Sequence, residues 1–293
     1  MVSWRVDVVH EGKDRLGEGP LWCPESRRLW WLDIFDAELC SYDPASGRVE
    51  TQRLVHKVHA LARAGWPWFV GTAHKLGVSW VNLETGVFTA IGHPEAGVAS
   101  NLLNDARVDE AGNLWFASIH KQHEPTAALY RLNAAGRIER MHGGLKTGNG
   151  LAFSPDGRWL YLIDTYVGIL RFPRQEGGIG APTLLLDANL LQGWPDGMTI
   201  DSDGCLWVAL AHGGAVVRVT PDGKVDATLG IPSRFATSCT FGGDDLGTLY
   251  ITSATIGRSP EELAAYPLSG ALFAIRTGHH GLPETPYAGR PPA

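Results

Sequence analysis

The chain has 293 residues and a formal net charge of −6. It contains no cluster of lysine and arginine that could replace counterions along a phosphate backbone, which argues against nucleic-acid binding. No run of 18 apolar residues occurs, and the N-terminal sequence MVSWRVDVVHEGKD lacks the apolar core of a signal peptide. We therefore expect a cytoplasmic protein without membrane association, and nothing in the sequence points to an obligate protein partner.

The composition favours an all-β protein. The chain contains 36 glycines and 11 tryptophans, and 44% of its residues are hydrophobic. These proportions are typical of many short strands joined by tight turns, whereas helical runs of Ala, Glu, Leu and Lys are scarce.

One pattern recurs about six times. Each copy opens with a polar residue or a turn, continues into an apolar strand, turns at an acidic or glycine-containing sequence, and ends in a strand rich in Trp, Tyr and Phe. The copies begin at Glu18, near His59, at Asn104, at Asn149, at Asp196 and near Ser238. Their spacing of about 40 to 47 residues is the length of one four-stranded propeller blade. The sequence therefore predicts a six-bladed β-propeller that forms one domain over residues 1–293.

The two ends of the chain suggest how the ring closes. Residues Ser3 to His10 alternate as a strand before the first repeat, so we expect them to form the outer strand of the last blade and remove an exposed sheet edge. The sequence after Arg276 is rich in Gly and Pro, and we expect it to trail over the surface. A short helix is predicted over Pro260 to Ala265, with Ser259 as its N-cap.

The four cysteines show no CxxC spacing and lie in or beside predicted strands, which favours reduced structural thiols over a metal or redox role. They are Cys23, Cys40, Cys205 and Cys239.

Four of the repeat-opening residues carry oxygen donors. The first strand of each blade lines the channel of a propeller, so equivalent positions in different blades converge on the axis. Two carboxylates and two amides suit a hard divalent cation such as calcium, magnesium or manganese, and zinc is also conceivable. The residues are Glu18, Asn104, Asn149 and Asp196.

A turn-forming role is the alternative for some of these residues. Asn149 and Asp196 each precede a glycine, and Asn-Gly and Asp-Gly are common turn sequences. Glu18 is a poor turn former, and its place before Pro20 and an apolar run buries a charge that needs compensation. The coincidence of all four positions in the repeat favours a central metal site.

Four segments resemble the senescence-marker-protein/gluconolactonase family, which includes regucalcin and bacterial sugar lactonases. They are LGEGPLW (16–22), NDARVDEAGNLWFAS (104–118), GNGLAFSPDGRWLYLIDT (148–165) and PDGMTIDSDGCLWVAL (195–210). The resemblance implies a six-bladed propeller with one divalent metal in its channel, most simply calcium or zinc, with manganese, magnesium or ferrous iron as alternatives. It also implies an enzyme whose partner is a small sugar lactone.

Carried over by position, the resemblance makes Glu18, Asn149 and Asp196 the metal ligands. It makes Asp196 also the catalytic base, and Asn104 a contact to substrate or metal-bound water.

One position departs from the family pattern. Leu102 stands where the family has a substrate-binding arginine, and its loss removes a multi-donor contact to sugar hydroxyls. Asn101, or a histidine of the following loop such as His120, is then the expected substrate contact.

The implied reaction is lactone hydrolysis, in which the metal polarises the carbonyl and Asp196 removes a proton from water. No G-x-S-x-G nucleophile sequence occurs. Two alternatives stay open: another metal-dependent hydrolase, acting on a non-sugar lactone or a phosphotriester, and a non-catalytic metal-binding propeller. For His120, His123 and His212, a structural role is the simpler interpretation.

Overall fold

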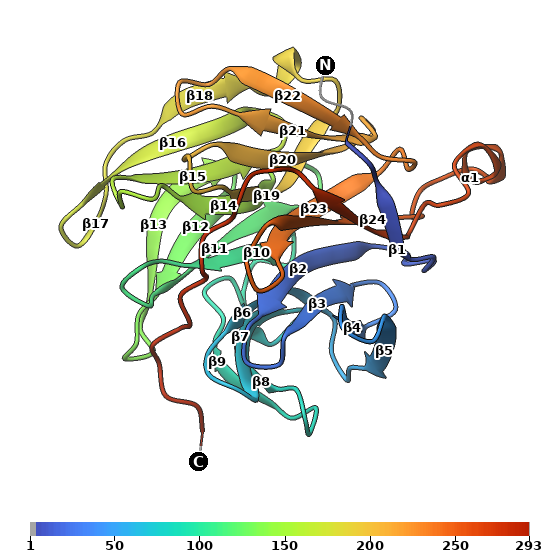
Figure 1. The fold of residues 1–293 in the computed structure, drawn as a ribbon. Helices are drawn as coiled ribbons and strands as arrows, with labels where there is room; N and C mark the ends of the chain where they lie inside the picture. Colours follow the sequence, from blue (N-terminus) through green and yellow to red (C-terminus); the bar gives the residue numbers. More distant parts are fainter. Residues whose placement is uncertain (1–3, 293) are drawn as a thin grey trace.

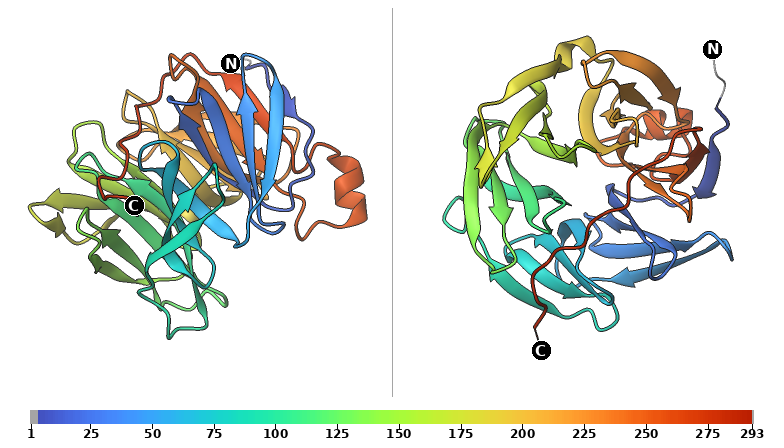
Figure 2. Two further views of the ribbon diagram at one scale, coloured as in Figure 1. Left: turned by 90° about the horizontal axis from the view of Figure 1, so that it is seen from below. Right: turned by 60° about the vertical axis from the view of Figure 1, so that its left-hand side comes forward.

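The computed structural model describes residues 4–292. It consists of six antiparallel sheets arranged around a central channel, as expected for a six-bladed propeller (Figures 1 and 2). The predicted fold is therefore confirmed. Each sheet begins with the strand nearest the axis and continues outward in sequence order, except that the outer strand of the last sheet is the N-terminal strand.

The first three blades are regular four-stranded sheets. Blade one contains β2 (Gly17–Cys23), β3 (Arg28–Asp33), β4 (Glu38–Asp43) and β5 (Arg48–Arg53). Blade two contains β6 (Val58–Arg63), β7 (Trp68–Ala73), β8 (Gly77–Asn82) and β9 (Phe88–Gly92). Blade three contains β10 (Asn101–Val108), β11 (Leu114–His120), β12 (Ala127–Leu132) and β13 (Ile138–Leu145).

The last three blades add some irregular segments. Blade four contains β14 (Gly148–Phe153), β15 (Trp159–Asp164) and β16 (Gly168–Gln175), with β17 (Gly178–Ile179) and β18 (Thr183–Asp187) both paired with β16. The 3-10 helix η1 (Ala188–Leu190) follows. Blade five contains β19 (Trp194–Ile200), β20 (Leu206–Ala211), β21 (Ala215–Val219) and β22 (Val225–Gly230). Blade six contains β23 (Ala236–Gly242), β24 (Thr248–Ser253), β25 (Leu272–Arg276) and β1 (Asp7–His10).

The N-terminal strand closes the ring. Strand β1 pairs antiparallel with β25, so the first and last strands of the chain share one blade. The predicted strand began at Ser3, which lies outside the described residues; the observed strand begins at Asp7. This pairing supplies the sixth blade with its outer strand and leaves β25 without an exposed edge.

Apolar side chains hold neighbouring blades together. One buried cluster joins Trp207 of blade five to Phe241 and Phe273 of blade six. Trp31, Trp115 and Trp207 are almost completely buried, as expected for aromatic residues that pack between blades. The inner strands β2, β6, β10, β14, β19 and β23 contact one another in succession, and β23 contacts β2. The channel is therefore enclosed on all sides by its own inner strands.

Every inner strand has an irregularity near its N-terminal end. The pairing register shifts between Glu18 and Leu21 in β2, and similar shifts occur at the start of the other five inner strands. A β-bulge bends the strand and redirects its side chains. Because the inner strands run in the same direction, all six bulges lie at one end of the channel, which we call the mouth.

The C-terminal segment crosses the opposite end of the channel, the far face (Figure 2). In the strap formed by residues 279–288, the Gly281 amide donates to the Leu246 carbonyl, and the Tyr287 amide donates to the Arg63 carbonyl. Tyr287 is buried and its hydroxyl donates to the Asn133 carbonyl at 2.8 Å. The expectation of a tail that only trails over the surface is wrong, because its backbone is hydrogen-bonded to several blades.

The predicted helix and the expected free thiols are confirmed. Helix α1 (Pro260–Ala265) begins at Ser259, which forms a reciprocal capping box with Glu262. All four cysteines are free and buried. Among residues 4–292, no helix has the length and apolar character needed to cross a membrane.

Candidate metal centre at the channel mouth

The bulges at the mouth carry the residues that the sequence singled out. Glu18 comes from β2, Asn104 from β10, Asn149 from β14 and Asp196 from β19. The Asn104 amide group donates to Asn149 Oδ1 at 2.5 Å and to the Gly148 carbonyl at 3.1 Å. Residues 45 positions apart in the sequence thus make direct contact across two blades.

A chain of hydrogen bonds fixes the orientation of Asn149. Its Nδ2 donates to Thr165 Oγ1 at 2.8 Å, and the Thr165 hydroxyl donates to the Pro195 carbonyl at 3.0 Å. The nitrogen of the amide is therefore engaged by the adjacent loop, and Oδ1 is the atom turned toward Asn104. These two hydrogen bonds link Asn149 of blade four to Pro195, the residue that precedes Asp196 in blade five.

Three carboxyl groups lie close to one another at this end of the channel. Burial raises the pKa of Glu18 well above its ordinary value, and the charges of Asp196 and Asp105 raise it further. Burial likewise raises the pKa of Asp196, with a smaller contribution from Asp105. Glu18 Oε2 accepts a hydrogen bond from the Gly19 amide at 3.0 Å. Within residues 4–292, no lysine or arginine forms an ion pair with Glu18 or Asp196.

These residues fit a divalent cation. They offer two carboxylates and one amide oxygen from three different strands, and hard cations such as calcium and magnesium prefer oxygen ligands. A bound cation would also supply the positive charge that neither Glu18 nor Asp196 receives from a side chain. Glu18, Asn149 and Asp196 could therefore hold the metal.

Asp105 was not identified from the sequence. It follows Asn104 within the bulge between Leu103 and Ala106, and burial raises its pKa to about 6, although the Arg107 charge opposes this shift. Its position next to Asn104 was the feature of the sequence that could have identified it as a site residue. A strand would turn consecutive side chains to opposite faces, whereas a bulge alters this alternation.

The three remaining predicted residues lie in blade three, near the start of β10. Asn101 is buried, and its Nδ2 donates to Glu95 Oε1 at 3.2 Å. His120 is buried, and its Nδ1 accepts the backbone amides of Gln122 at 3.2 Å and Glu124 at 2.9 Å, which holds the following loop. Leu102 is half-buried and pairs with Ile119. Their roles in substrate binding stay predictions.

In blades two and six, other side chains stand at the start of the inner strand, where the other four blades carry a carboxylate or an amide. Burial lowers the pKa of His59 to about 4, so this imidazole is neutral near pH 7. In blade six, the Thr237 hydroxyl donates to the Gly17 carbonyl, which ties β23 to the start of β2. The carboxylate and amide side chains are thus confined to blades one, three, four and five.

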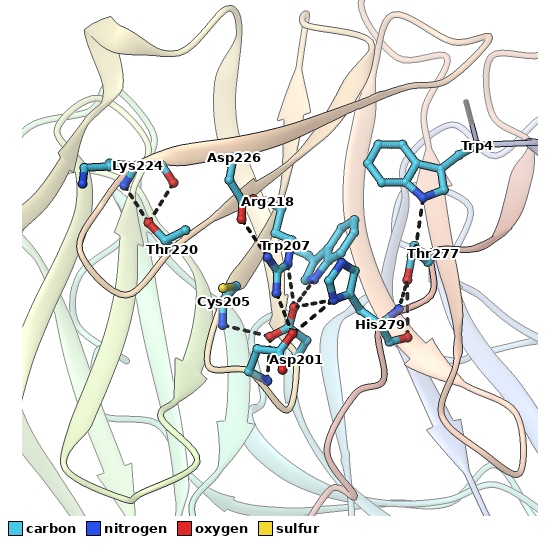
Figure 3. Close-up of polar contacts among 11 residues, drawn as sticks. Trp4, Asp201, Cys205, Trp207, Arg218, Thr220, Lys224, Asp226, Thr277 and His279 are labelled. Carbon is cyan, nitrogen blue, oxygen red and sulfur yellow. Dashed lines mark hydrogen bonds and ion pairs between the residues drawn. The ribbon is translucent and has the colours of Figure 1, made fainter. Parts of the chain in front are cut away.

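A second acidic cluster lies near the far face (Figure 3). Asp201, Asp203 and His279 are close enough to suggest a cation site. However, Arg218 donates to Asp201 at 2.8 Å and to Asp203 at 2.9 Å, and it pairs with Asp226 at 2.7 Å. The guanidinium thus already supplies the positive charge that a metal would bring.

The Asp201 carboxylate also accepts hydrogen bonds from the backbone and from Trp207. Its oxygens accept the Cys205 amide at 2.9 Å and Trp207 Nε1 at 2.9 Å. Asp109 of blade three is used in the same way, because it accepts Trp115 Nε1 at 2.8 Å and pairs with Arg174 at 3.3 Å. The repetition of this arrangement in two blades identifies it as part of the blade architecture.

A cavity of about 480 Å³ occupies the channel between the mouth residues and the strap. Asp105 and Arg107 line it, together with strap residues 282–285. Arg107 forms an ion pair with Glu284 at 2.7 Å and donates to Thr199 Oγ1 at 3.0 Å. The strap is therefore joined to an inner strand of the channel.

The fold and this geometry define a class: six-bladed propellers that bring oxygen ligands from several inner strands to one end of an axial channel. Residues 16–255 match the family model described as SMP-30/Gluconolactonase/LRE-like region. The chain belongs to this family, as its sequence motifs indicated.

Named relatives cover almost the whole chain. The 6-deoxy-6-sulfogluconolactonase of Pseudomonas putida is 37% identical over 94% of this chain and 95% of its own length. The L-arabinolactonase of Azospirillum brasilense is 33% identical over 98% of this chain and 97% of its own length. A crystal structure of regucalcin from Agrobacterium tumefaciens, described as a calcium-binding protein, has 28% identity and a TM-score of 0.91 over 97% of both chains.

Proposed function

We propose that this protein hydrolyses a sugar lactone to the corresponding aldonic acid, with a divalent metal held by Glu18, Asn149 and Asp196. The observation that carries the proposal is the pair of buried Glu18 and half-buried Asp196, which has no cationic side-chain partner among residues 4–292 and lies at the mouth of an axial channel. Relatives named as lactonases of a sulfonated hexose and of a pentose support the reaction class. The calcium-binding relative supports a divalent ion.

The metal would supply Lewis acidity toward the lactone carbonyl and lower the pKa of bound water. Asp196 acts as the general base and takes a proton from the attacking water, and such a group contributes about 10² to 10⁴ in rate. Asp196 is half-buried, so it is partly shielded from bulk solvent, which strengthens its interactions with charge that develops during the reaction.

Asn104 is suited to hold a substrate hydroxyl. Both hydrogens of its amide group are used, one by the Gly148 carbonyl and one by Asn149 Oδ1. Its Oδ1 therefore remains as an acceptor, and a sugar hydroxyl is a suitable donor. Asn104 thus positions the ring of the lactone beside the carboxylates.

The side of the ring near Leu102 is recognised differently from the family pattern. Leu102 cannot donate a hydrogen bond, and the Asn101 amide is engaged by Glu95. His120 has Nδ1 occupied by two backbone amides, so the hydrogen of a neutral ring is on Nε2. We propose that His120 Nε2–H is the donor that remains for this part of the substrate.

The test is ring opening, followed with a pH indicator on a panel of pentonolactones and hexonolactones. Chelated protein is compared with protein supplied with calcium, zinc, manganese, magnesium or ferrous iron. Metal-dependent turnover above the spontaneous rate supports the proposal, and the preferred ring identifies what the Leu102 side of the site selects.

The same assay separates the alternatives. If no sugar lactone is opened with any metal, phosphotriesters and non-sugar lactones are assayed next. If metal binding persists without turnover of any substrate, the non-catalytic metal-binding propeller is the better description.

A further inference from the structure

Five aromatic rings form a continuous arc at the mouth, contributed by blades three to six. The ring centroids of His123 and Tyr166 are 4.4 Å apart, and those of Tyr166 and Trp194 are 5.7 Å apart. Trp194 is 4.4 Å from His212, which is 4.9 Å from Phe235. Each ring contacts the next, so the arc is one surface rather than five separate side chains.

Polar contacts fix both ends of this arc. At one end, His123 Nδ1 is 2.8 Å from Thr147 Oγ1, and His123 Nε2 is 3.2 Å from the Tyr166 hydroxyl. At the other end, the Arg258 guanidinium lies 4.9 Å from the Phe235 ring centre and 3.3 Å from His212 Nδ1. The rings are therefore held in place before any ligand binds, which reduces the entropy lost on binding.

The second and third rings of the arc, Tyr166 and Trp194, are exposed. Trp194 is 48% exposed and Tyr166 is 38% exposed, whereas Trp115 and Trp207, which pack between blades, are almost completely buried. Aromatic rings at the surface that do not serve the core are typical of binding sites, because they offer a large, rigid contact area.

The arc adjoins the proposed metal ligands. Trp194 begins β19 and lies two residues before Asp196. Thr165, which binds Asn149 and the Pro195 carbonyl, immediately precedes Tyr166. The same short segments thus position both the oxygen ligands and the aromatic rings.

The extent of the arc exceeds what one lactone ring can cover, since it runs over four consecutive blades. We propose that it binds a glycosyl residue attached to the lactone, so that the substrates include lactones of disaccharide-derived aldonic acids. The C–H face of a pyranose packs against an aromatic ring, while its hydroxyls meet the Tyr166 hydroxyl and His212 Nε2. This inference rests on the proposed lactonase activity and concerns the same site; the glycosidic bond itself is not broken.

The kinetic test compares cellobiono-1,5-lactone with glucono-1,5-lactone. In the unmodified protein, kcat/KM should be higher for cellobionolactone, mainly through a lower KM. Trp194→Ala and Tyr166→Ala should each lower the ratio of the two kcat/KM values about fivefold, the effect of losing one aromatic contact. Trp194→Phe should restore most of the ratio, because it keeps a ring.

Trp66→Ala is the matched control, since Trp66 is 42% exposed but is not part of the arc. It should leave the ratio unchanged. A ratio of one in the unmodified protein, or a ratio that survives both alanine substitutions, would overturn the inference.

A binding measurement separates this inference from the lactonase proposal. Titration calorimetry with cellobionate and gluconate, carried out with calcium present, needs no turnover. Cellobionate should bind more tightly, and Trp194→Ala should remove the difference. If neither lactone is hydrolysed but this difference is seen, the arc is supported while the reaction is wrong; equal affinities overturn the arc whatever the turnover.

Discussion

The two acidic clusters of this propeller show two ways to bury a carboxylate. Near the far face, Asp201 is surrounded by donors and paired with Arg218 at 2.8 Å. At the mouth, Glu18 is also buried and Asp196 is half-buried, but Glu18 has a single backbone donor in Gly19, and neither pairs with a cationic side chain in the part of the chain that the structure describes. The first cluster is complete as it stands, whereas the second is suited to an external cation.

The largest expected effect concerns activity. Asp196→Asn removes both the proposed base and a proposed charged ligand, so we expect kcat to fall about 10³-fold. Steady-state lactone hydrolysis measures it. Asp203→Asn, which changes an acidic residue of the far cluster, should leave kcat within about twofold, because Asp203 lies outside the mouth. Full activity of Asp196→Asn would refute its role as base.

The next effect concerns stability. Arg218→Met leaves Asp201 buried without its cation, and we expect the free energy of unfolding to fall by about 3–5 kcal/mol. Urea denaturation measures it. Arg137→Met changes an arginine whose side chain is 74% exposed, and it should cost less than about 0.5 kcal/mol. If Arg218→Met lowers the free energy of unfolding as little as Arg137→Met does, the far cluster does not need its guanidinium.

The effect of added metal on thermal stability shows which of the two clusters binds the ion. An ion at 100 times its Kd stabilises the folded protein by about 2.7 kcal/mol, so calcium or zinc should raise the Tm of the unmodified protein. Glu18→Gln should abolish most of this rise, because it removes one of the two charged ligands that we propose. In Asp203→Asn the rise should persist; its loss there would place the ion at the far cluster instead.

The smallest effect concerns the half-buried carboxyl group of Asp14, which pairs with no guanidinium within residues 4–292 and lies outside both acidic clusters. Burial raises the pKa of Asp14 from 3.8 to about 7, although its hydrogen bond from Trp31 Nε1 opposes this. The folded state therefore binds the proton more tightly than the unfolded state. The resulting stabilisation is present below about pH 4 and is lost as the pH rises to about 7.

Asp14→Asn should remove this pH dependence. In the unmodified protein, protonation of Asp14 adds about 1–3 kcal/mol to the decrease of the unfolding free energy between pH 5 and pH 8. Asp14→Asn should lack this part of the decrease, as measured by urea denaturation. Asp36→Asn changes a more exposed carboxylate nearby and should keep the original slope. Equal slopes for Asp14→Asn and the unmodified protein would contradict the raised pKa.

Repetition explains how much of the structure the sequence could predict. The spacing of the six copies predicted both the blades and the shared position of Glu18, Asn149 and Asp196, because equivalent positions of a propeller meet at the axis. Helix α1 was predictable from its cap at Ser259.

Features that depend on a single local geometry were not predictable. Asp105 reaches the site because of a shift in pairing register, and register leaves little trace in the hydrophobic pattern. The strap has no periodicity at all, so its fixed course follows only from contacts such as Arg107 with Glu284. The aromatic arc comes from short loops of four blades whose proximity appears only in the folded ring.

Closure of the ring by β1 has a consequence for biosynthesis. Strand β1 leaves the ribosome well before its partner β25, which lies at the other end of the blade order. The ring therefore stays open until β25 has been synthesised, and until then the nascent blades hold an unpaired strand that another chain could capture. We therefore expect chains that lack β25 to aggregate more readily than the complete ring.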